Sequence, residues 1–153
     1  MKLYLVEIGG MREGSLFESH EVHAVVAADE GQLVSTCAAR FAKTMTAAHL
    51  DGWTEIDLDL RARERPERHA SFFVAELGRN SSASMREEHD YRFLEATSWK
   101  AAVQTARQSA PGWHVDACVD LDALAEQNGY ALMRSGDGAP PQTRSQARYI
   151  RFV

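Results

Sequence analysis

The stretch LYLVEIG at residues 3–9 and the stretch FFVAELG at residues 72–78 decide the fold. A shift of 69 positions places the first on the second, and the register continues without a gap as far as Phe41. Eight of these 39 aligned pairs are identical, and the apolar positions match as well. When the shift is shortened to 65, His49-Leu50-Asp51 falls on His114-Val115-Asp116. Self-similarity at a fixed spacing marks a repeated structural unit, so the chain is predicted to contain two copies of one module.

Each copy has the pattern of two strands, a helix and a third strand. Strands are expected at residues 3–8, 22–26 and 53–56 of the first copy, and at 72–77, 91–94 and 118–121 of the second. Asp29 and Ser98 occupy equivalent positions, and both are favoured N-cap residues for a following helix. In the first helix an apolar residue recurs at every fourth position, Leu33, Cys37 and Phe41. This spacing predicts one buried helix face.

The predicted fold class is α+β, with two tandem ββαβ modules packed together and an additional C-terminal β hairpin. The predicted boundaries are a first repeat at 1–60, a charged linker at 61–70, a second repeat at 71–124 and a C-terminal extension at 125–153. The two added strands of the extension are expected at Tyr130–Met133 and Tyr149–Val153.

Composition limits the classes of partner. The net charge is −5, with 22 acidic against 17 basic side chains, which argues against nucleic acid as a partner because phosphate binding needs a basic surface. An arginine cluster at 61–68 is interrupted by acids and proline, and it indicates a solvated linker. No signal segment or membrane-spanning run is recognised, and the two cysteines form no CxxC pair. We therefore expect a cytoplasmic protein without membrane partners.

Three motifs resemble one known family. They are KLYLV at residues 2–6 leading into Gly9-Gly10, the step Glu18-x-His20-Glu21, and His49-x-Asp51. Together they resemble the bacterial domain of unknown function 1543, whose members carry one or two copies of the domain. The resemblance covers most of residues 2–58 and, more loosely, residues 71–122, where Arg79 stands in place of the second glycine. It implies no activity, substrate or cofactor.

Four of the six histidines occupy matched positions in the two copies, and each has acidic neighbours. The candidate site residues are His20, His89, His49, His114, Glu18, Glu87, Asp51 and Asp116. Imidazole beside carboxylate is the donor set of metal sites and of general acid–base pairs. It also occurs where a histidine only fastens the end of a strand to its own module. Because no HExxH or paired-cysteine motif is present, we favour this structural latch, in which His20 and His89 are largely buried.

No motif in the sequence identifies a catalytic residue or a cofactor. The interpretation we favour is a non-enzymatic binding or assembly module, with a homo-oligomer as one form of assembly and no identified small-molecule ligand. The alternative is a small hydrolase or metal-dependent enzyme that uses the repeated histidines and acids.

Overall fold

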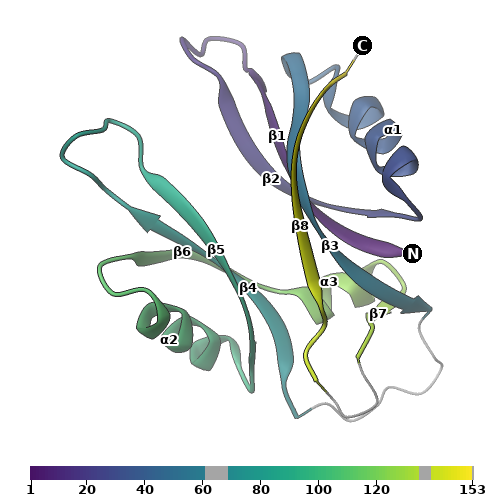
Figure 1. Cartoon of the computed structure of the whole chain (residues 1–153), viewed down its shortest axis with the longest axis vertical. Helices are drawn as coiled ribbons and strands as arrows, with labels where there is room; N and C mark the ends of the chain where they lie inside the picture. Colours follow the sequence, from purple (N-terminus) through teal and green to yellow (C-terminus); the bar gives the residue numbers. More distant parts are fainter. Residues whose placement is uncertain (61–68, 135–138, 153) are drawn as a thin grey trace. The chain divides into compact units, whose positions relative to one another are not determined.

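The computed structural model describes residues 1–60, 69–134 and 139–152, and its fold class is α+β, as predicted (Figure 1). The order strand, strand, helix, strand occurs twice. The chain divides into two compact units, Met1–Asp59 with Pro141–Val153 and Leu60–Pro140. Most of the predicted linker, residues 61–68, lies outside the described residues. No helix in the described ranges is long and apolar enough to cross a membrane.

The first unit is an antiparallel sheet covered by one helix. Its elements are β1 (Lys2–Met11), β2 (Ser19–Ala27), α1 (Glu30–Phe41), β3 (Thr46–Leu60) and β8 (Thr143–Arg151). Strand β1 lies between β2 and β3, and β8 pairs with the part of β3 that runs from His49 to Ile56. The side chain of Asp29 accepts a hydrogen bond from the backbone N–H of Gln32, which confirms the predicted N-cap.

The core of this unit lies between α1 and one face of the sheet. Leu33, Cys37 and Phe41 are buried, as their spacing predicted, and they share a cluster with Val6 and Ile8 of β1. Successive strand residues point to opposite faces. Glu7 and Gly9, which alternate with Val6 and Ile8, therefore belong to the face away from α1.

The second unit repeats this arrangement with a thinner core. Its elements are β4 (Ser71–Arg79), β5 (Glu88–Ala96), α2 (Trp99–Ser109), β6 (His114–Asp120), α3 (Leu121–Gln127) and β7 (Tyr130–Leu132). Strand β4 lies between β5 and β6. Helix α2 buries Ala102 and Ala106 where α1 buries larger residues. The second helix therefore gains less stabilisation from apolar burial than the first.

Two details of the C-terminal region differ from the sequence prediction. The predicted hairpin is wrong, because β8 pairs with β3 and begins at Thr143, earlier than expected. Helix α3 was also missed. It has only seven residues, too few for a clear apolar period, and it starts where the third strand of the repeat was expected to end. Its buried Asp122 accepts hydrogen bonds from the backbone of Phe72 and from Arg134, which joins α3 to β4.

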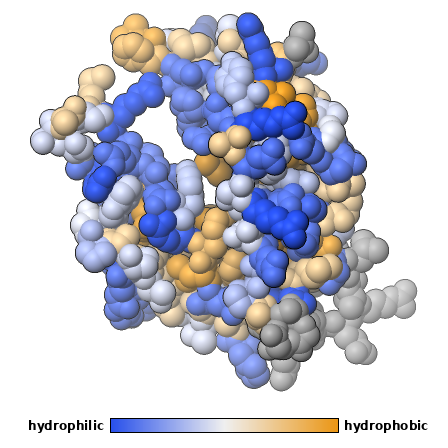
Figure 2. Space-filling model, viewed as in Figure 1, coloured by the Kyte–Doolittle hydropathy of each residue, from blue (hydrophilic) through white to orange (hydrophobic). Residues whose placement is uncertain are grey.

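The face of the molecule shown in Figure 2 is mostly polar, with apolar groups between the hydrophilic ones. Several of the exposed apolar residues lie in the two loops that join the first and second strands of each repeat. Leu16 and Phe17 belong to the loop after β1, and Met85 belongs to the loop after β4.

Candidate metal-binding sites

In the first unit, one row of three residues across the sheet positions the two matched histidines. Gly9 of β1 pairs with His20 of β2 on one side and with His49 of β3 on the other. Directly paired residues of antiparallel strands point to the same face, so both imidazoles lie over Gly9 on the face away from α1. A Cβ atom at Gly9 would overlap Nε2 of His49 and lie 2.9 Å from Oδ2 of Asp51. Only glycine leaves room for this group.

A β-bulge brings Asp51 to the same place. Glu7 pairs with Gly52 and Ile8 pairs with Leu50, so Asp51 is the extra residue on β3. Bulges re-aim side chains and are common beside functional sites. Oδ1 of Asp51 lies 3.3 Å from Nε2 of His49, and Oδ2 lies 3.4 Å from Nε2 of His20.

Glu18, just before β2, completes the group of four. Its carboxylate oxygens lie 3.4 Å from Nε2 of His49 and 3.8 Å from Nε2 of His20. One donor atom each from Glu18, His20 and His49 lie within 4.8 Å of one another. All four side chains of the group are therefore supplied by one repeat.

The orientation of His49 is decided by its second ring nitrogen. His49 is 4% exposed, and its Nδ1 lies 3.0 Å from the carbonyl oxygen of Ala47. A carbonyl can only accept, so Nδ1 carries a proton and donates it to Ala47, which leaves Nε2 as the ring atom directed at the carboxylates. Ala47 has a φ of 56°, in the left-handed region that costs a residue with a side chain about 1–2 kcal/mol. The Tyr149 ring of β8 packs against His49, with centroids 4.5 Å apart.

The buried oxygen of Asp51 is short of a partner. Oδ2 is inaccessible to solvent and has no hydrogen-bond partner among the described residues. A buried acceptor without a donor costs about 1–3 kcal/mol, and more if it is charged. Nε2 of His49 and several carboxylate oxygens thus face one another, an arrangement that a proton or a metal cation between them would stabilise.

The second unit repeats the group on equivalent positions. Gly78 of β4 pairs with His89 and His114, and a bulge again leaves the aspartate, Asp116, as the extra residue. A Cβ at Gly78 would overlap Oδ2 of Asp116 and lie 2.7 Å from Nε2 of His114. Nε2 of His114 lies 2.7 Å from Glu87 and 3.1 Å from Asp116. Nε2 of His89 lies 3.5 Å from Glu87 and 3.8 Å from Asp116.

The eight predicted residues therefore form two groups of four, one in each copy. The expectation that His20 and His89 are largely buried is wrong, because their side chains are 36% and 42% exposed. Both histidines lie on the outer strands β2 and β5, which have a neighbouring strand on one side only among the described residues. The buried, backbone-bonded ring expected of a latch is that of His49.

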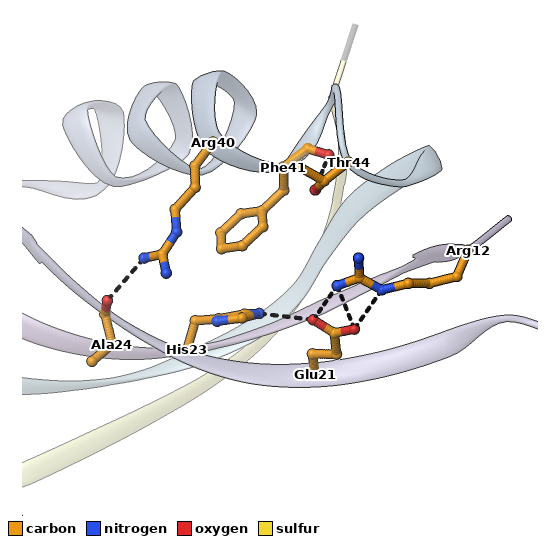
Figure 3. Close-up of polar contacts among 7 residues, drawn as sticks. All are labelled: Arg12, Glu21, His23, Ala24, Arg40, Phe41 and Thr44. Carbon is orange, nitrogen blue, oxygen red and sulfur yellow. Dashed lines mark hydrogen bonds and ion pairs between the residues drawn. The ribbon is translucent and has the colours of Figure 1, made fainter.

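A second polar cluster lies on the helix face of β2 and was not predicted (Figure 3). Arg12 donates two hydrogen bonds, of 2.8 and 2.7 Å, to the Glu21 carboxylate, and the ring of His23 lies 3.1 Å from the same carboxylate. These contacts, chiefly the hydrogen bond from Arg12, lower the pKa of Glu21. His23 also packs on Phe41, with ring centroids 4.6 Å apart. The cluster lacks a signal in the sequence, since the residue matched with His23 is Arg92.

Comparison with known proteins supports the fold alone. No family model matches the chain, and no curated protein matches it. The resemblance to the domain of unknown function 1543 therefore stays a prediction. The solved structure of protein Il1583 from Idiomarina loihiensis is similar, with a TM-score of 0.63 and 21% identity. The alignment covers 99% of this chain and 97% of that one, so the similarity in fold extends over nearly the whole length of both chains.

Proposed function

We propose that this chain is a non-enzymatic metal-binding protein that holds one divalent transition-metal ion in each repeat. The observation that carries the proposal is that both copies assemble two histidines, a glutamate and a bulged aspartate over a glycine. A latch needs only one histidine and one acceptor. It does not explain why four donor groups, and the glycine that makes room for them, occur together twice.

The spacing of the donors in the first repeat supports this proposal. Donor atoms that share a tetrahedral zinc ion, with bonds of about 2.0–2.1 Å, lie about 3.3 Å apart. Three of the four histidine–carboxylate distances in the first repeat are 3.3, 3.4 and 3.4 Å. Two imidazoles favour zinc and neighbouring transition metals over calcium or magnesium, and the donor set lacks the thiolates that select softer ions.

The number of donors favours binding over catalysis. Structural zinc sites are closed by four protein ligands, whereas catalytic sites have three and keep one position for water or substrate. Each repeat offers four side chains, enough to close the site. The hydrolase alternative would require that one of the two carboxylates does not coordinate the metal, so that water or substrate can take its place.

We further propose that the protein works in the cytoplasm. Cys37 and Cys118 are both free thiols, which suits a reducing compartment.

A homo-oligomer built through sheet edges is our proposal for assembly, since the outer edges of β2 and β5 are unpaired among the described residues. Light scattering of the purified protein tests whether it forms a homo-oligomer, and a monomer at all concentrations would refute this proposal.

The test of metal binding is elemental analysis and zinc titration of the purified chain. We expect two ions per chain, and one ion after His20→Ala or after His89→Ala. His69→Ala is the matched control, because His69 is exposed and lies outside both groups. Zinc should also raise the melting temperature of the parent, because a ligand that binds the folded state stabilises it. If the parent binds no zinc while His20→Ala lowers its stability, the latch is the correct reading.

A further inference from the structure

We infer that the two sites fill in order, with the first repeat as the tight site because the C-terminal strand β8 supports it and the second repeat as the weak one. This inference rests on the proposed function. It concerns the regulation of the same sites: one ion is held, and the other is exchanged.

In the first site, the contacts around His49 fix the orientation of its ring before an ion binds. The ring of His49 is buried, its Nδ1 donates to Ala47, and Tyr149 packs against its face. Groups beyond the ligands that orient a metal-binding histidine typically change metal affinity by about 10–100-fold. In addition, Oδ2 of Asp51 gains its missing partner when a cation binds.

The second site lacks this support, and two of its ligand residues, His114 and Glu87, already contact each other. The side chain of His114 is 49% exposed, and no hydrogen bond to its Nδ1 is found among the described residues. Its Nε2 lies within hydrogen-bond distance of Glu87, at 2.7 Å, and Asn80 donates to the same glutamate oxygen at 3.1 Å. An ion must displace the contact between His114 and Glu87 before it can use either residue, which lowers affinity.

Part of the difference comes from strand β8, which pairs within the first unit. Strand β8 pairs with β3 and supplies Tyr149, and the backbone N–H of Phe152 donates to the carbonyl of Ala48. In the described part of the second unit, β6 has β4 as its single neighbour in the sheet. Because coupling between two equilibria is reciprocal, an ion in the first site also stabilises the pairing of β8.

The experiment is a zinc titration in competition with a chromophoric chelator, on the full chain and three variants. We expect two steps that differ about 10–100-fold in affinity. His114→Ala should remove the weak step and keep the tight one. Tyr149→Ala should weaken the tight step about tenfold or more and leave the weak step unchanged, whereas Tyr149→Phe, which keeps the ring, should resemble the parent.

Hydrogen exchange supplies a second measurement that does not depend on the variants. The amides of β8 should become more protected after the first equivalent of zinc, with little further change after the second. Two steps of equal affinity, a tight step lost in His114→Ala, or protection of β8 only at the second equivalent would overturn the inference while leaving metal binding intact. If the parent binds no zinc, both this inference and the proposed function are overturned.

Discussion

The substitution Gly9→Ala tests the central geometric feature of the first site. An added Cβ would overlap Nε2 of His49 and lie 2.8 Å from its Cε1 and 2.9 Å from Oδ2 of Asp51. The ring cannot turn away easily, because it is buried, packed against Tyr149 and bonded to Ala47. One methyl group must therefore displace a histidine that is held from three sides.

The magnitude follows from two opposing effects. In a strand, alanine in place of glycine normally gains about 0.5–1 kcal/mol, because glycine loses more backbone entropy on folding. Forcing an extra carbon into a packed site costs about 1–3 kcal/mol, and the bond from Nδ1 of His49 to Ala47 adds about 1 kcal/mol if it breaks. We expect a net loss of about 1–3 kcal/mol and the loss of the tight zinc step.

Urea denaturation of the metal-free protein and zinc titration measure the two effects separately. The matched control is Gly78→Ala, which should remove the weak step and leave the tight step unchanged, since its Cβ would meet Asp116 and His114 instead. A Gly9→Ala protein that is as stable as the parent and still binds two ions with unchanged affinity would refute the assignment of this row of residues as a site.

Three further predictions concern the rest of the first unit and the thiols. Leu33→Ala should cost about 2–5 kcal/mol in urea denaturation, because Leu33 is fully buried on the face of α1 that packs against the sheet; a loss below about 1 kcal/mol would mean that this helix face is not core. Cys118, which is partly exposed, should react with a thiol reagent before Cys37, whose burial raises its pKa to about 11; faster labelling of Cys37 would contradict the packing. The pKa of Glu21 is lowered from 4.5 in the folded state. The stability that its ionised carboxylate contributes to the folded protein is therefore present above about pH 4.5 and is lost as the pH falls below it. Melting curves of the parent and of Arg12→Ala should thus differ most above pH 5 and converge in acid, and a difference that grows in acid would have the wrong sign.

Local pattern alone was enough to predict the α+β fold class. The period of the apolar residues and the N-cap positions Asp29 and Ser98 are properties of neighbouring residues, and the structure confirms both. The matched histidines and acids were also visible, because aligning the sequence with itself displays them without any knowledge of the fold.

Only the tertiary structure decided which of these residues meet. His20 and His49 are far apart in the sequence and become neighbours because both pair with Gly9. Strand register is a long-range property, and a slip of one residue would move these side chains to the opposite face of the sheet. The bulge that turns Asp51 toward them depends on how β1 and β3 align.

The C-terminal strand shows the same division most clearly. The sequence indicated a strand near Tyr149, since the residues there are β-formers, but it placed that strand in a hairpin with its nearest predecessor. The structure pairs β8 with β3 and brings Tyr149 onto His49. A strand's tendency to form is local, whereas its partner is chosen by which free edge offers unpaired backbone groups and which side chains it can cover.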